Sequence, residues 1–160
     1  MAVDWKHYTF AELGVDLLYA ILALRQEVFV VEQTCYYLDA DGKDREALHV
    51  VGLQGDKLVA YTRVLDRGVS YPDYASIGRV VTAPAVRGQG LGRPLMQESL
   101  RVLYAHYGEQ PVKISAQAHL QKFYGGLGYR GVGEVYEEDG IPHRAMVLNI
   151  SASGIPTGVA

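Results

Sequence analysis

The sequence predicts an α+β fold, in which one mixed sheet carries helices on its faces. Two observations support this prediction. Short runs of alternating or continuous apolar residues, typical of strands, are interspersed with two longer runs in which apolar residues recur every three or four positions, as in amphipathic helices. Their order along the chain, strands before a helix and then strand, helix, strand and strand, is that of an α+β arrangement.

Length and composition describe an ordinary globular protein. The 160 residues are 49% apolar and 21% charged, which is enough for a hydrophobic core, so we expect a single domain over residues 1–150. Residues 151–160 are small, polar and interrupted by glycine and proline, and we expect a flexible tail there.

Several classes of function are disfavoured by the same numbers. The net charge is −3 and basic residues are scattered, so nucleic acid is not an expected partner. The only cysteine, Cys35, excludes an internal disulfide and fits a reducing cytosol. No signal-peptide or membrane-span pattern occurs, and the five histidines lack the paired spacing of a metal site. We expect a soluble, cytoplasmic protein with no membrane partner and no metal; a homodimer is compatible with the sequence.

The first half of the chain begins with a predicted strand at Trp5–Tyr8 and a capping-box pattern, T-x-x-E, at residues 9–12. A helix capped by Asp16 should follow and end near Val31, with Arg25 at the edge of its buried face. That face is formed by Leu17, Leu18, Ile21, Leu24 and Val28. A long polar loop, residues 32–46, precedes a hairpin whose strands, His49–Gln54 and Lys57–Leu65, flank Gly55-Asp56.

The second half begins with a strand at Ala75–Thr82, inside which Gly78 predicts a bulge or a close backbone approach. A helix over Gly90–Tyr107 and a strand over Val112–Ala116 come next. The last predicted elements are a shorter helix near residues 119–127 and a closing strand pair, residues 129–137 and 143–150, across a five-residue turn.

The stretch 86–95, V-R-G-Q-G-L-G-R-P-L, lies where a predicted strand is followed by a helix. The first N–H groups of a helix lack partners and its dipole makes that end partly positive, while glycine lets a ligand approach the backbone, so a phosphate is the expected ligand. The dinucleotide pattern G-x-G-x-x-G and the Walker ending G-K-[ST] are both absent. What remains is R-x-x-G-x-G, from Arg87 to Gly92; a turn that merely starts a helix is the alternative interpretation.

This loop resembles the pyrophosphate loop of the GCN5-related N-acetyltransferase (GNAT) superfamily, which binds acetyl-coenzyme A. Further motifs narrow the resemblance to its ElaA-like branch: V-F-V-V-E-Q at 28–33, I-G-R-V-V at 77–81, A-Q-A-H-L-Q at 116–121 and E-D-G-I-P-H at 138–143. The match runs in order from about Trp5 to Ile150. It implies a mostly antiparallel sheet whose central strands, 75–82 and 112–116, splay apart to admit the coenzyme.

The resemblance also implies which residues hold the donor, acetyl-CoA. The pyrophosphate would meet backbone N–H groups and two arginine side chains, and the pantetheine amides would pair with a strand as though they were an added strand. The residues concerned are Arg87, Gly88, Gln89, Gly90, Leu91, Gly92 and Arg93 for the pyrophosphate, and Val80, Val81 and Thr82 for the pantetheine. A backbone N–H near Val80 or Val81 could face the thioester oxygen, although both residues also suit a core strand. Gln117 replaces the asparagine that many members carry as a pantetheine contact.

Tyr124 is the candidate general acid, because its F-Y position resembles that of the family's thiolate-protonating tyrosine. A phenol can protonate or hydrogen-bond a departing thiolate, although a helical tyrosine is more often a core residue. The base that deprotonates the amine is left open among four candidates, which are Glu32, His119, Asp139 and His143.

Two acidic loops bear on the acceptor in the proposed fold. They contain Asp39, Asp41, Asp44 and Glu46, and Glu137, Glu138 and Asp139. Their carboxylates could attract a cationic amine of a small molecule or peptide, or could simply keep the loops solvated.

The favoured function is an acetyl-CoA-dependent N-acetyltransferase, in which a primary amine attacks the thioester directly within a ternary complex. The alternative is a non-catalytic acyl-CoA sensor or interaction domain of the same fold. A nucleotide-binding protein is weakened by the two absent phosphate-loop patterns.

Overall fold

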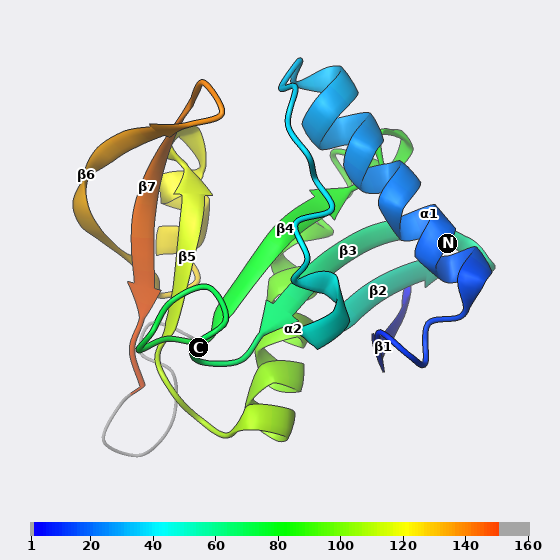
Figure 1. The fold of residues 1–160 in the computed structure, drawn as a ribbon, viewed down its shortest axis with the longest axis horizontal. Helices are drawn as coiled ribbons and strands as arrows, with labels where there is room; N and C mark the ends of the chain where they lie inside the picture. Colours follow the sequence, from blue (N-terminus) through cyan, green and yellow to red (C-terminus); the bar gives the residue numbers. More distant parts are fainter. Residues whose placement is uncertain (1, 151–160) are drawn as a thin grey trace.

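The computed structural model describes residues 2–150, which form two antiparallel sheets side by side (Figure 1). The four-stranded sheet has the order β1-β2-β3-β4, and the three-stranded sheet has the order β5-β7-β6. Their strands are β1 (Asp4–Thr9), β2 (Leu48–Gln54), β3 (Lys57–Leu65), β4 (Ser76–Thr82), β5 (Val112–Gln117), β6 (Arg130–Glu138) and β7 (Ile141–Leu148). The predicted α+β class is confirmed.

Within residues 2–150, the two sheets are joined just before β4 and at the start of β5. A parallel bridge joins Ala75 to Val112, and the Lys113 N–H donates to the Ala75 carbonyl oxygen at 2.9 Å. Beyond this bridge no ladder connects β4 to β5 within residues 2–150, so the strands diverge in a V, as the predicted splay requires (Figure 1).

Helices cover both faces of the larger sheet. On one face α1 (Val15–Arg25) continues without a break into a π-helical segment, η1 (Gln26–Glu32), and on the other lies α2 (Gly92–Tyr107) (Figure 1). Behind the smaller sheet lie η4 (Ala118–Leu120) and α3 (Gln121–Gly125). The remaining short helices are η2 (Asp44–Glu46) and η3 (Pro84–Val86). None of the helices in residues 2–150 combines the length and the apolar character needed to span a bilayer.

Strand β3 shows why helices pack on both faces of the larger sheet. Successive side chains of a strand point to opposite faces. Ala60 and Val64 belong to the core shared with α2, where the buried Thr62 hydroxyl also bonds Ser99, whereas Val59 and Tyr61 belong to the core under α1. Because both faces are buried, β3 is apolar along most of its length instead of alternating with exposed polar residues.

The N-terminal end of α1 corrects one prediction. Thr9 and Glu12 do form the reciprocal capping-box bonds, 2.9 Å and 3.3 Å long, but they close an isolated turn and not a helix. The helix begins at Val15 after Gly14, whose φ of 75° is one that glycine accepts readily. Asp16 is therefore a first-turn residue beside the positive helix end and not its cap.

The final hairpin is tighter than predicted. Asp139 and Gly140 alone connect β6 to β7, with φ values of 51° and 78°, as a two-residue type I′ turn requires. Glu138 pairs with Ile141, and Glu137 with Pro142, so both residues belong to the strands. The predicted tail, 151–160, lies outside the described residues.

Candidate active site

A cavity of about 830 Å³ occupies the wedge between β4 and β5. Its walls come from η1 and the loop after it, from both diverging strands, from η4 and α3, and from the β6–β7 hairpin. These segments are far apart in the sequence, and the splay of the two sheets brings them together (Figure 1). A cleft at such a junction is the default place to look for a ligand site.

Strand β4 forms one wall and is interrupted by a bulge. The register with β3 shifts between Tyr61 and Arg63, and Arg79 has a φ of 50°, unusual for a residue with a side chain. The bulge that Gly78 predicted is thus confirmed next to it: Gly78 pairs with Arg63, and Arg79 and Val80 lie opposite the single residue Thr62.

Beyond the bulge, β4 offers backbone groups to the cavity. The Ala83 N–H donates to the Val59 carbonyl oxygen at 2.8 Å, and Val81 lies opposite Tyr61. Since every second residue of an antiparallel strand directs its N–H and C=O away from its partner, those of Val80 and Thr82 point toward the cavity. This edge has no strand beside it within residues 2–150, so an extended ligand could pair with it.

The glycine loop lies between η3 and α2. Gly88 and Gly90 have φ values of 85° and 72°, and a Cβ built on either would meet no atom within 4 Å. Five backbone N–H groups of this loop find no acceptor within the part of the chain that the structure describes: those of Gly88, Gly90, Leu91, Gly92 and Arg93. Open space above unpartnered N–H groups at a helix N-terminus fits a diphosphate.

Gly92 brings this loop close to α3. A Cβ at Gly92 would lie 3.2 Å from Cζ of Phe123, so only glycine fits without displacing the ring. Phe123 packs edge-on against Tyr124 at 5.0 Å between ring centroids, and Tyr124 packs against Tyr129 at 5.9 Å. The start of α2 is thereby fixed near the wall that contains Tyr124.

Tyr124 lines the cavity and is only 5% exposed. Burial raises the pKa of its phenol to about 12, so the group remains protonated over the whole physiological range. A neutral phenol at the cavity wall can donate a hydrogen bond or a proton, which is what the predicted acid role needs.

Two residues predicted for different roles contact each other. Glu32 and Arg87 form a two-pronged ion pair, with Nη2–Oε1 and Nη1–Oε2 distances of 2.6 Å and 3.0 Å, at the cavity rim. Both side chains are a little under half exposed. The hydrogen bond to Glu32 raises the pKa of Arg87, and Glu32, a candidate base, is engaged with a cation.

The other base candidates also lie at the cavity. His119 comes from η4 and finds no hydrogen-bond partner within residues 2–150, and Asp139 forms the tip of the last hairpin. His143 is buried on β7, with Nδ1 2.7 Å from the Ile141 carbonyl oxygen and Nε2 3.5 Å from Oε2 of Glu138. Gln117, opposite His143 on β5, donates to Gln33 at 3.4 Å.

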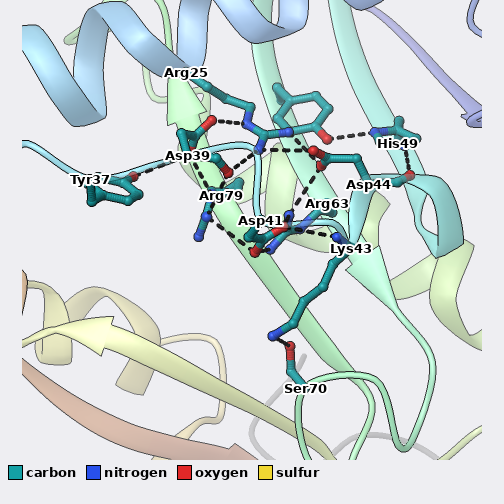
Figure 2. A network of polar contacts seen from close by, with 11 residues as sticks. Arg25, Tyr37, Asp39, Asp41, Lys43, Asp44, His49, Arg63, Ser70 and Arg79 are labelled. Carbon is teal, nitrogen blue, oxygen red and sulfur yellow. Dashed lines mark hydrogen bonds and ion pairs between the residues drawn. The ribbon is translucent and has the colours of Figure 1, made fainter.

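The carboxylates of the acidic loop after η1, which could have attracted a cationic acceptor, face arginines of the same chain. Asp39, Asp41 and Asp44 each form ion pairs with arginines of the same chain and so offer little free negative charge (Figure 2). Burial alone would raise the pKa of Asp44, but the hydrogen bond and charge of Arg25, together with those of Arg63, outweigh it and hold the pKa below its usual value. Glu46 is exposed and does not line the cavity.

Arg25 is the centre of this network and not an edge residue as predicted. Its Nε lies 2.7 Å from Asp39, its Nη1 lies 2.7 Å from Asp44, and its side chain is 1% exposed (Figure 2). Arg63 joins Asp41 to Asp44, and Arg79 joins Asp39 to Asp41, so three cations balance three anions. The network fastens the loop that forms one cavity wall to β3 and β4.

A family model described as the acetyltransferase (GNAT) domain matches residues 21–150. The chain belongs to the GNAT acetyltransferase family. It is 44% identical to Protein ElaA of Escherichia coli over 92% of this chain and 97% of that relative. It is also 41% identical to a UPF0039 protein of Synechocystis over 96% of this chain and 100% of that relative.

Solved structures agree with this placement. The crystal structure of Escherichia coli ElaA has a TM-score of 0.84 at 44% identity and covers 91% of this chain and 98% of its own. An acyl-CoA N-acyltransferase from Pseudomonas aeruginosa has a TM-score of 0.86 at 45% identity, over 91% of this chain and 99% of its own. The predicted resemblance to GNAT proteins and their ElaA-like branch is confirmed, and this family uses acyl-CoA.

The sequence did not single out several residues that the GNAT cavity contains. Arg79 was part of a family motif, but its left-handed backbone and its ion pairs depend on a bulge and on a distant loop. Ser115 on β5 bonds the Tyr136 hydroxyl and lies 3.5 Å from Glu138. The alternation of β5 (Val112, Ile114 and Ala116 buried, the residues between them less so) is a signal that could have placed Ser115 on the cavity side.

Proposed function

We propose that this GNAT protein is an acetyl-CoA-dependent N-acetyltransferase that acts on a primary amine by direct attack in a ternary complex. The observation that carries the proposal is one continuous cavity, which brings the open edge of β4 together with Tyr124 and Arg87, the residue that precedes the glycine loop. The similar protein from Pseudomonas aeruginosa, an acyl-CoA N-acyltransferase, supports transfer to nitrogen.

On the donor side, the glycine loop would hold the diphosphate through the N–H groups that lack acceptors, with Arg87 and Arg93 adding positive charge. The outward backbone groups of Val80 and Thr82 would pair with the pantetheine amides. When bound, acetyl-CoA supplies a thioester as the acyl donor. Of the two N–H groups considered for the thioester oxygen, that of Val80 points toward the cavity and that of Val81 toward β3, so Val80 is favoured.

Two features support direct attack without an acyl-enzyme. Cys35 lines the cavity, but its thiol is buried and directed at the carbonyl oxygens of Asp139 and Gln33, 3.3 Å and 3.5 Å away. No histidine contacts it within residues 2–150, so it lacks the base that an acyl-accepting thiol needs. Tyr124 remains protonated and would return a proton to the sulfur that leaves.

The free negative charge of the acceptor side lies on the β6–β7 hairpin. Glu138 and Asp139 line the cavity and form no ion pair with an arginine or lysine among the described residues, whereas the carboxylates after η1 are neutralised by Arg25, Arg63 and Arg79. A cationic amine of a small molecule or peptide would therefore be attracted toward the hairpin.

Thermal unfolding in the presence of acetyl-CoA, free CoA, ATP or NAD tests the donor assignment. Only the two coenzyme A compounds should raise the Tm, by mass action on the native state. Gly90→Glu should abolish this shift, because the new side chain and its charge would occupy the phosphate path. Gly55→Glu is the matched control: Gly55 also has a positive φ and open space around it, but lies in the β2–β3 turn.

A screen of amines for thiol release from acetyl-CoA then tests turnover. Release that depends on a primary amine and is lost in the Gly90→Glu variant is the expected result. Tight acetyl-CoA binding with no thiol release across small amines and peptide N-termini would contradict the enzyme and favour an acyl-CoA sensor. Unchanged coenzyme affinity in the variant would contradict the role of the loop.

A further inference from the structure

We propose that His143 is the general base for the acceptor amine and that Glu138 is a positioning residue that stabilises its charged form. This inference rests on the proposed N-acetyltransferase function and selects one of four base candidates. It is carried by the hydrogen bond of the imidazole to Ile141, by the carboxylate of Glu138 near Nε2, and by the place of His143 in the cavity.

The tautomer of His143 follows from its partners. Nδ1 lies 2.7 Å from the Ile141 carbonyl oxygen, which can only accept, so Nδ1 must carry the hydrogen. In the neutral ring Nε2 then has a free lone pair. A base needs that lone pair, and the bond to Ile141 fixes the ring orientation that directs it.

The neighbours of Nε2 favour a transient positive charge. Oε2 of Glu138 lies 3.5 Å away, and the Tyr136 ring stacks against the imidazole at 6.2 Å between centroids. Asp139 at the hairpin turn lines the same cavity. Arg144, the next residue on β7, points to the opposite face, where its guanidinium covers Gly131. A carboxylate near an imidazolium stabilises the charged form.

His143 is largely buried but still faces the cavity, as a general base must. Its side chain is 9% exposed and lines the cavity, whereas the Glu138 side chain is 51% exposed and lies at its edge. His143 is thus shielded from bulk water, whereas Glu138 is in contact with bulk water. Ser115 extends the polar wall, since its hydroxyl bonds Tyr136 and lies 3.5 Å from Glu138.

The other candidates are less suited. Both carboxylate oxygens of Glu32 accept hydrogen bonds from Arg87, at 2.6 Å and 3.0 Å, so the side chain is already engaged. Asp139 is at the tip of a turn, and its backbone carbonyl oxygen accepts a hydrogen bond from the Cys35 thiol. No partner within residues 2–150 fixes the tautomer or orientation of His119.

Each proton of the proposed acetyl-transfer step is accounted for. The acceptor ammonium loses two protons as its nitrogen forms a bond to the acetyl carbon and the carbon–sulfur bond breaks. Nε2 of His143 takes the first and releases it to water past Glu138. Tyr124 donates its phenol proton to the departing coenzyme sulfur, and the second proton of the amine restores the phenol.

The test compares two substitutions with matched controls. His143→Asn keeps a donor for the Ile141 carbonyl oxygen but has no Nε2, and Glu138→Gln keeps the shape without the charge. His106→Asn on α2 and Glu134→Gln on β6, both exposed and outside the cavity lining, are the controls. We expect His143→Asn to lower kcat/KM by about 10²-fold or more at neutral pH, the typical effect of a general base.

Two further readouts separate a base from a structural residue. In the His143→Asn variant kcat/KM should keep rising with pH toward the pKa of the free amine, about 10.4 for an alkylammonium like that of lysine, because only deprotonated amine then reacts. Glu138→Gln should lower kcat/KM at neutral pH by less than His143→Asn does, because the imidazolium formed in the step loses its neighbouring carboxylate. The Kd for acetyl-CoA should change less than twofold in either variant.

The tautomer can be checked without turnover. Nitrogen NMR of the ¹⁵N-histidine-labelled protein should show hydrogen on Nδ1 of His143; hydrogen on Nε2 in the neutral ring would overturn the inference. Wild-type kcat/KM in His143→Asn would overturn it while leaving the N-acetyltransferase function intact. If the wild-type protein releases no thiol with any amine, the function fails and the base assignment fails with it.

Discussion

Replacing Arg25 with methionine should destabilise the protein more than any exposed arginine substitution. The guanidinium contacts Asp39 and Asp44 at 2.7 Å each and donates to the Asp39 carbonyl oxygen at 3.0 Å. Methionine keeps the apolar stem that packs near Tyr61 but removes the charge. The substitution therefore isolates the ionic contribution of a fully buried side chain.

The magnitude follows from what is left behind. Removing one partner of a buried ion pair costs about 3–5 kcal/mol, because the other charge stays buried and uncompensated. Here Asp39 keeps Arg79 and Asp44 keeps Arg63, so we expect the lower end, about 3 kcal/mol. For a domain of this size that corresponds to a Tm lower by roughly 6–12 °C.

Urea unfolding at pH 7 measures the effect, with Arg101→Met as the control. Arg101 pairs with Glu98 three residues away, but its side chain is 59% exposed, so its loss should cost about 1 kcal/mol or less. Equal effects of the two substitutions, or a loss below about 1 kcal/mol for Arg25→Met, would refute a stabilising network.

The pH dependence adds a second check. The pKa of Asp44 is held below its usual value, so its pairing contributes stability above the unfolded pKa of about 3.9 that is lost as pH falls through the folded value. Arg25→Met removes part of this depression. The stability difference between wild type and variant should then narrow below about pH 4. A difference that stays constant down to the acid transition would contradict the assignment.

Three further substitutions test separate parts of the structure. Glu32→Gln should tighten CoA binding by about 1.4- to 5-fold in calorimetry, because an exposed ion pair of roughly 0.2–1 kcal/mol no longer competes for Arg87; a large loss of turnover would instead identify Glu32 as the base. Tyr124→Phe should leave the Kd for CoA nearly unchanged and lower kcat by about 10²-fold, and wild-type kcat would end the acid assignment. Burial lowers the pKa of His49, so the native state should lose stability as pH falls below about 6.5, and His49→Gln should flatten that part of the unfolding curve.

The elements that the sequence predicted well are those whose signals are local. The β2–β3 hairpin was predicted from Gly55-Asp56 between two apolar runs, and Gly55 has the positive φ that such a turn needs. The bulge was predicted from Gly78 inside a strand. The final hairpin carried an equally local signal in Asp139-Gly140, but the predicted turn was five residues long and included Pro142, which lies near the start of β7.

The parts that could not be predicted depend on contacts between distant residues. Periodicity assigns Arg25 to the border of the apolar face of α1, and nothing near it in the sequence shows that partners 14 and 19 residues away neutralise it. The same contacts explain why the acidic loop presents little free negative charge to the cavity. A count of carboxylates in a loop gives its formal charge, whereas the field in the cavity depends on which arginines lie beside them.

The buried network also connects the loop after η1 to strand β4. Arg79 adopts a φ of 50°, a conformation that costs a residue with a side chain about 1–3 kcal/mol and persists only where the surrounding structure enforces it. Asp39 holds its Nε at 2.8 Å, and Asp41 lies 3.4 Å from its Nη2. These ion pairs hold the bulge next to Val80, whose N–H points toward the cavity because Val81 and Ala83 pair with β3. Loosening the loop after η1 should therefore disturb the strand on which the acyl donor would lie, even though the aspartates need not touch it.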